Sequence, residues 1–186
     1  MNIITTISFI IISQLVYKTI SYDQVSDDKD VPIILNSGFD EEGNKKYRDH
    51  WLNSSLGGPL QITSGPVHHG DKAAKFPSSS DRIAYQLIDV DKNTEYTLSF
   101  YYTMKTTPKG ELKVAVLGGH ITDQKQIEKA SIESITLTDQ SSANKFIQAS
   151  LSFNSSNHDQ VAIYISNKDA ECRVDTFTIK KSTNDH

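Results

Sequence analysis

Between residues 82 and 180 the chain is built from short segments in which apolar and polar residues alternate. An alternation with a period of two places the apolar side chains on one face of a β-strand. The pattern occurs in seven segments, at residues 82–90, 95–105, 111–119, 131–138, 145–153, 160–166 and 172–180. The connections are rich in Asp, Asn, Ser, Pro and Gly, which favour turns, and only residues 122–130 suit a helical turn. The pattern therefore predicts an all-β fold, a β-sandwich of two antiparallel sheets.

The alternation also assigns side chains to faces. Phe100 and Tyr102 follow the apolar phase of their strand, so Tyr101 is expected to point outward. In the segment before it, Tyr85 lies on one face, while Arg82 and Gln86 lie on the other. The alternation does not say which of these two faces is buried.

The N-terminus carries a different signal. Residues 3–16 form an apolar run, and small residues at Thr19 and Ser21 suit a signal peptidase, so residues 1–21 are predicted to be a secretory signal. The alternatives are a buried first strand or a spanning helix, although a bilayer requires about 20 apolar residues. Residues 22–30 are expected to be a flexible lead-in, residues 31–181 one domain, and residues 182–186 a tail. We therefore expect a secreted protein, extracellular or periplasmic, without membrane insertion.

Charge and cysteine content exclude several classes of protein. The chain has a net charge of -4, and removal of residues 1–21 leaves 18 basic against 23 acidic residues, a charge of -5. An acidic chain argues against nucleic acid as a partner, because phosphate binding needs a concentrated positive field. Cys172 is the only cysteine, so no intrachain disulfide can form, and its place in an alternating segment predicts a buried thiol.

Several motifs occur in a recognisable order. They are Trp51 and the segments "LNSGFD", "HHGDKAAKF", "AYQLIDVDKNTEYTLSFYY" and "RVDTFTI". In this order they resemble carbohydrate-binding modules of the family 4 and family 9 type, which are galactose-binding-like jelly rolls. The resemblance spans residues 31–181 and implies a jelly-roll sandwich that binds polysaccharide without catalysis.

The resemblance also implies a structural calcium ion that joins the two ends of the domain. Asp40 in "NSGFD" and Asp175 in "RVDTF" match the carboxylates that hold this ion in such modules, and the carbonyl of Lys72 is a third candidate. Calcium takes six to eight oxygen ligands, which carboxylates and main-chain carbonyls supply. The alternative is that Asp40 caps a turn and Asp175 faces solvent.

Sugar binding requires aromatic platforms and hydrogen-bonding groups at their edges. The aromatic candidates are Trp51, Tyr47, Tyr85 and Tyr101, and the polar candidates are Arg48, Arg82, Gln86 and His120. Trp51 is the only tryptophan, and its alternative role is in the core. The arginines suit a uronic-acid or sulfated polymer, whereas the aromatics suit a neutral glucan equally well.

Two other functions remain open at this stage. A jelly roll can act as a polysaccharide lyase or a glycoside hydrolase, and Tyr101 with His120 is a candidate pair for a lyase. The sequence has none of the "GxSxG", "HExxH" or glycine-rich phosphate motifs that would indicate other enzymes. An extracellular protein-interaction or adhesion module is the second alternative. For the polysaccharide-binding module itself, a carbohydrate-active enzyme or a surface complex is a further candidate partner.

Overall fold

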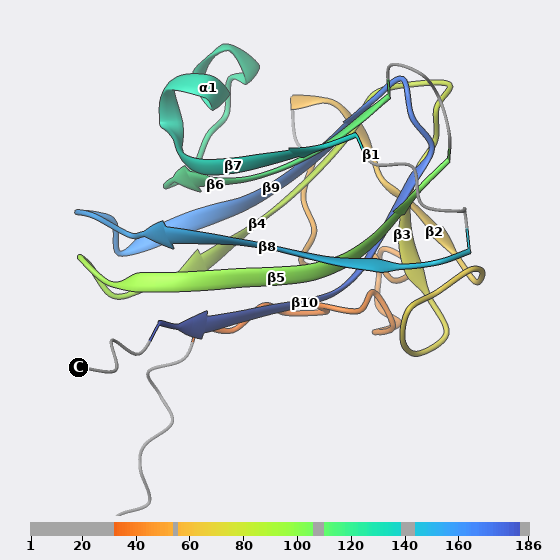
Figure 1. Ribbon diagram of the computed structural model, residues 1–186, viewed down its shortest axis with the longest axis horizontal. Coiled ribbons are helices and arrows are strands. Elements are labelled where there is room, and N and C mark those ends of the chain that lie inside the picture. Colours follow the sequence, from red (N-terminus) through yellow and green to blue (C-terminus); the bar gives the residue numbers. More distant parts are fainter. Residues whose placement is uncertain (1–31, 54–55, 106–109, 139–143, 183–186) are drawn as a thin grey trace, which may run out of the picture.

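The computed structural model describes residues 32–53, 56–105, 110–138 and 144–182. The predicted signal peptide and lead-in lie outside these residues, as does the tail after Ser182. Figure 1 shows two stacked β-sheets with a single short helix above one of them. No helix in the described ranges is long and apolar enough to span a membrane.

Each sheet has five strands. Sheet A has the order β1-β4-β9-β6-β7, and its strands are Gly58–Pro59 (β1), Arg82–Asp89 (β4), Gln160–Lys168 (β9), Glu111–Gly118 (β6) and Ser131–Leu137 (β7). Sheet B has the order β2-β3-β10-β5-β8, and its strands are Gln61–Thr63 (β2), Ala73–Phe76 (β3), Cys172–Lys181 (β10), Glu95–Met104 (β5) and Ile147–Asn154 (β8). Every pairing is antiparallel except that of β1 with β4. The all-β class and the two-sheet jelly-roll sandwich are therefore confirmed.

All seven predicted strands are present, with ends that differ by at most two residues. The helical turn expected in residues 122–130 is also present, as a 3-10 turn at Gln124–Gln126 (η3) followed by α1 at Ile127–Ala130. The sequence pattern missed β1, β2 and β3, which have only two to four residues each. Segments this short contain too few alternations to be recognised.

The core lies between the sheets, where the predicted inward phases meet. Phe100 and Tyr102 of β5 face Ile163 of β9 across this layer, and all three side chains are buried. Cys172 is fully buried at the start of β10, and burial raises the pKa of its thiol to about 12. Both the inward phase of β5 and the inert, buried cysteine were correct predictions.

The segment from Asn36 to Trp51 packs its aromatic rings into one end of this core. The Phe39 ring lies 5.1 Å from the Trp51 ring, and the Trp51 ring lies 5.3 Å from the Phe177 ring of β10. The indole N–H of Trp51 donates a hydrogen bond to the carbonyl of Asn36. Trp51 is only 4% exposed, so the prediction of an exposed stacking platform is wrong and its core alternative is correct.

An irregularity in β10 makes this packing possible. The register of β10 against β5 shifts between Asp175 and Thr178, and Thr176 has a positive φ of 53°. Such a bulge turns consecutive side chains to new directions. Here it directs Phe177 into the core, and the Phe177 amide donates to the carbonyl of Ser37.

Replacement of Trp51 by alanine should lower the free energy of unfolding by about 3–5 kcal/mol, because a fully packed aromatic ring is lost from the core. Urea denaturation followed by circular dichroism measures this change. Ile33→Ala is the control, since Ile33 is 71% exposed and its truncation should change stability by less than about 0.5 kcal/mol. Equal effects of the two substitutions would contradict the core assignment of Trp51.

Candidate functional site

The outer face of sheet A, which points away from the core, carries two kinds of side chain. Near the middle of the sheet Tyr85 of β4 pairs with Tyr164 of β9, and Ala115 of β6 follows on the other side. One step along the strands, Ser166 of β9 lies between Ile83 of β4 and Lys113 of β6. The face therefore changes from apolar to polar along the direction of the strands.

The chain itself covers the apolar part of this face. Leu56, Ile121 and Ile127 pack on it and form a second buried cluster with Tyr85 and Tyr164. Tyr85 is 3% exposed, so the prediction that it offers a stacking platform is wrong. The cover comes from Leu52 and Leu56 and from the segment that contains η3 and α1, and the sequence alone did not indicate that these side chains cover the sheet.

The polar part remains open as a groove of about 360 Å³ between the sheet and the η3–α1 segment. Its charged lining residues are Asp81, Glu111, Glu128, Arg82, Lys113 and Lys168. Three acids and three bases balance each other, and Tyr164 and Ser166 add hydroxyl groups. A charge-balanced groove with many donors and acceptors suits a neutral ligand that is rich in hydroxyls.

Two predicted ligand residues belong to this face. Arg82 lines the groove, and its guanidinium donates to the Ser80 hydroxyl at 2.9 Å and to the carbonyl of Pro59 at 3.3 Å. His120 is exposed beside the covered end, with its ring 6.0 Å from the ring of Tyr85. Arg82 is therefore held in place before any ligand arrives.

Gln86 is not a groove residue. Its side chain points into the sandwich and is 3% exposed. Its carbonyl accepts a hydrogen bond from the amide of Leu35 at 2.7 Å, and its amide group donates to the Leu35 carbonyl at 2.9 Å. Because both polar atoms are satisfied by one backbone residue, Gln86 fixes the first described segment to β4, and its prediction as a ligand residue is wrong.

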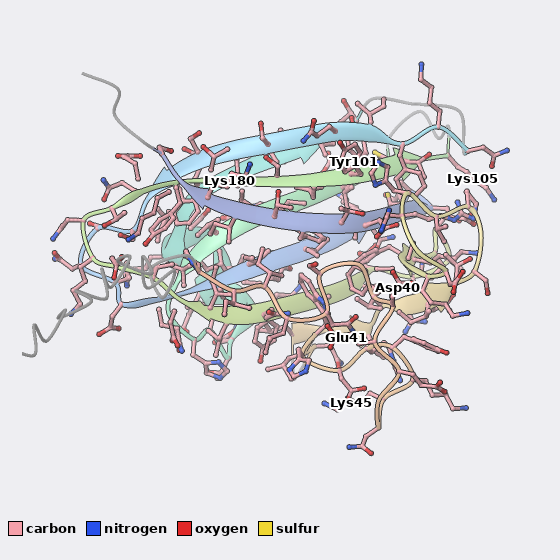
Figure 2. The ribbon with its side chains drawn as sticks, turned by 90° about the horizontal axis from the view of Figure 1, so that it is seen from below. Asp40, Glu41, Lys45, Tyr101, Lys105 and Lys180 are labelled. Atoms are coloured by element: carbon pink, nitrogen blue, oxygen red, sulfur yellow. The ribbon has the colours of Figure 1, made fainter. Side chains whose placement is uncertain are left out.

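Tyr101 and Tyr47 lie on other surfaces. Tyr101 points outward from sheet B, as predicted (Figure 2). The ring of His68 stacks on the Tyr101 ring, with 3.5 Å between the ring centres. Since His120 lies beside the outer face of sheet A, Tyr101 and His120 cannot form the lyase pair considered above. Tyr47 is half-buried in the first loop segment, where the ammonium group of Lys72 lies 5.1 Å from its ring centre.

A smaller cavity of about 220 Å³ lies at the edge of sheet A. Arg48 and the edge of Trp51 line it, together with Lys45. Ile83 lines both this cavity and the larger groove, so the two are neighbours. Arg48 and Arg82 thus belong to adjoining parts of one surface.

The two predicted metal carboxylates approach each other near Gly38. A Cβ atom built on Gly38 would lie 3.3 Å from Asp40 Oδ2 and 3.7 Å from Asp175 Oδ1. The other oxygen of each carboxylate is held by backbone amides, that of Asp40 by Asp71 and Lys72 and that of Asp175 by His68 and His69. A side chain at Gly70, where φ is 69°, would overlap the Asp40 carboxylate.

Asp175 does not face solvent, which contradicts its alternative role. Asp175 is 0% exposed. Burial raises the pKa of its carboxyl group, and the hydrogen bonds from the backbone N–H groups of His68 and His69 partly offset this rise. The Thr176 hydroxyl also donates to Asp175 Oδ1 at 3.2 Å. Phe39 and Thr176, beside these carboxylates, both have positive φ values, and such backbone strain often marks a ligand site. In the described residues no group of three or more His, Cys, Asp or Glu side chains gathers, so a cation here would depend on main-chain oxygens.

Sequence reasoning identified only Arg82 of the groove and missed its other lining residues, four of which matter most here. They are Tyr164, Lys113, Glu111 and Lys168. The alternation in residues 111–119 and 160–166 does place Lys113 and Tyr164 on the faces opposite the core residues. It does not reveal that β4, β9 and β6 are neighbours, because strand order and register depend on contacts between distant parts of the chain.

Comparisons with known proteins agree with this architecture. No protein-family model matches the sequence, and no curated protein matches it. Solved structures do match in fold. A complex of TmCBM61 with β-1,4-galactotriose has a TM-score of 0.56 and 12% identity, with 80% of this chain and 97% of that chain covered. A CBM4 structure has a TM-score of 0.52 and 16% identity, with 81% and 100% covered. The Stig cyclase Fisc from Fischerella sp. TAU, in complex with (3Z)-3-(1-methyl-2-pyrrolidinylidene)-3H-indole, has a TM-score of 0.54 and 14% identity, with 82% and 97% covered.

The chain therefore has the jelly-roll β-sandwich fold of carbohydrate-binding modules. The same fold also occurs in the Stig cyclase, so the fold alone does not define an activity.

Proposed function

We propose that this protein is a secreted, non-catalytic module that binds polysaccharide in the groove on the outer face of sheet A. The observation that carries the proposal is the open groove between β4, β9, β6 and α1, in a fold shared with carbohydrate-binding modules. Its balanced charges and hydroxyl groups suit the hydroxyls of sugars better than a strongly charged small molecule.

The form of the groove limits the ligand. Because the segment with Ile121 and Ile127 covers the adjoining apolar surface, only a short stretch of a polysaccharide fits against the sheet. Sugar binding also exchanges hydrogen bonds to water for similar bonds to protein. Dissociation constants from roughly micromolar to millimolar are therefore expected.

The absence of catalysis forms part of the proposal and needs its own assay. Glu111 and Glu128 both line the groove, and a pair of carboxyl groups across a bound sugar is what glycoside hydrolysis requires. The binding experiment below therefore includes measurement of reducing ends and of unsaturated products. Product formation would replace the binding module by an enzyme.

We further propose a structural calcium ion held by Asp40, Asp175 and the carbonyl of Lys72. Support comes from the convergence of two carboxylate oxygens near Gly38 and from the full burial of Asp175. A buried carboxylate is costly without a compensating charge, and calcium would supply it. The Lys72 side chain is turned to Tyr47, while its backbone N–H donates to Asp40, so its main chain lies at the site. When bound, the ion would link the first loop segment to β10.

Replacement of Lys113 by alanine should weaken glycan binding about 10-fold or more, because one charged hydrogen-bond donor is removed from the groove. Affinity electrophoresis against neutral glucans, xylan, mannan, alginate, pectin and carrageenan measures the change for each polymer that retards the protein. Lys180→Ala is the matched control, since Lys180 is an exposed lysine on sheet B (Figure 2).

If Lys113→Ala and Lys180→Ala reduce retardation equally, the ligand binds outside the groove. If none of the polymers retards the unsubstituted protein, glycan binding itself is contradicted.

Asp175→Asn should have opposite effects on the melting temperature in calcium and in chelator. In calcium the substitution removes an anionic ligand, so the melting temperature should fall by about 2–4 °C for each kcal/mol lost. In chelator the ionised, buried Asp175 carboxylate destabilises the fold. Its raised pKa means that this cost appears as the pH rises above the ordinary value of 3.8 and is complete above the folded-state pKa. The neutral amide removes that cost at pH 7.

Differential scanning fluorimetry of both proteins in both media makes this comparison. The same shift for Asp175→Asn with and without calcium would remove the metal site.

A further inference from the structure

The smaller cavity at the edge of sheet A differs from the groove in its charge. Its lining combines Lys45 and Arg48 with apolar surface from Trp51, Leu52, Pro59 and Ile83, and no acidic residue lines it within the described parts of the chain. The nearby carboxylate of Asp49 accepts a hydrogen bond from the backbone N–H of Lys45 at 2.9 Å, within the same loop. The cavity is therefore a local positive site on a protein whose net charge is negative.

The loop itself positions Arg48, one of the two cations of this cavity. The Arg48 Nε group donates to the carbonyl of Lys45 at 3.3 Å, and the Trp51 amide donates to the carbonyl of Arg48 at 3.1 Å. The buried side chain of Asn36 donates to the carbonyls of Tyr47 at 3.0 Å and Asp49 at 3.3 Å. A guanidinium that is already positioned loses less conformational entropy when a carboxylate binds.

The cavity and the groove form one continuous surface. Ile83 lines both, and Arg82 of the groove donates through Nη1 to the carbonyl of Pro59, which lines the cavity. A polymer that lies in the groove can thus reach the cavity with a neighbouring residue. In Figure 2, Lys45 projects with its loop away from the strands that carry Tyr101 and Lys180, so this surface is separate from the outer face of sheet B.

We propose that the edge cavity binds the carboxylate of a uronic acid residue in the polysaccharide that occupies the groove. This inference rests on the proposed function and adds the class of polymer. Arg48 offers a planar pair of donors that matches a carboxylate, and Lys45 adds a second positive charge. The apolar wall of Leu52 and Pro59 matches the C–H surface of the sugar ring.

Two forms of one polymer provide the test, polygalacturonate and its methyl ester, which differ only at the carboxyl group, an anion in the first and a neutral ester in the second. The protein should bind polygalacturonate more tightly, and Arg48→Gln should weaken that binding about 10-fold or more while it changes binding of the methyl ester less than about 2-fold. Arg48→Lys should restore only part of the affinity that Arg48→Gln loses, because lysine keeps the positive charge but lacks the planar pair of N–H donors. Affinity electrophoresis at two salt concentrations, with a melting curve for each variant, gives these comparisons.

Lys46→Gln is the control, because Lys46 is exposed in the same loop and does not line the cavity. An equal loss in Lys46→Gln, an equal loss for both forms of the polymer, or equal binding of sulfated carrageenan would overturn the uronate site. If Lys113→Ala weakens retardation and Arg48→Gln does not, glycan binding in the groove is supported and only the uronate site is contradicted. If no polymer retards the protein, both proposals fail together.

Discussion

The bulge in β10 is the constraint on which the rest of the structure depends. It turns two groups that are separated only by Thr176 in directions that a regular strand would not allow, the Asp175 carboxylate toward Gly38 and the Phe177 ring into the core. Phe177 then supports Trp51 and Phe39 of the first loop segment. The two ends of the domain are thereby joined in two ways. The rings of Phe39, Trp51 and Phe177 pack together in the core, and the carboxylates of Asp40 and Asp175 approach each other near Gly38. A regular β10 would lose both, because a shift of one residue moves every side chain to the opposite face.

The sequence was informative where local patterns decide the structure. Alternation located the seven longer strands, the outward direction of Tyr101 and the inward direction of Cys172, because each strand has one face in the core. It was insufficient where burial depends on contacts across the fold. Trp51, Tyr85 and Gln86 were all expected at a binding surface, and each is buried by a partner far away in the chain, namely Phe177, Ile127 and Leu35. Nothing in the residues around these three positions indicates those partners.

The same comparison explains why the candidate groove was only partly anticipated. Arg82 was identified because it is a charged residue in an alternating segment. Tyr164 has the same pattern but lies in a segment read as core, and the partners that make it part of a groove come from β6 and α1. A binding site on a sheet is a property of strand order. Strand order is set by the global packing of the sandwich rather than by any single strand.

The first loop segment couples the proposed metal most directly to one of the two binding regions. Asp40 and Arg48 belong to the same segment, which Asn36 and Trp51 tie together, so order imposed at Asp40 extends to the cations of the edge cavity. The groove is built from β4, β9, β6 and α1, and the first loop segment reaches it through β4, where Leu52 pairs with Tyr85 and Gln86 is hydrogen-bonded to Leu35. A contribution of calcium to glycan binding would therefore act mainly through the uronate site, because binding energies couple through elements whose order both ligands affect. Neutral sugars in the groove would be held by a part of the sandwich that the metal does not contact.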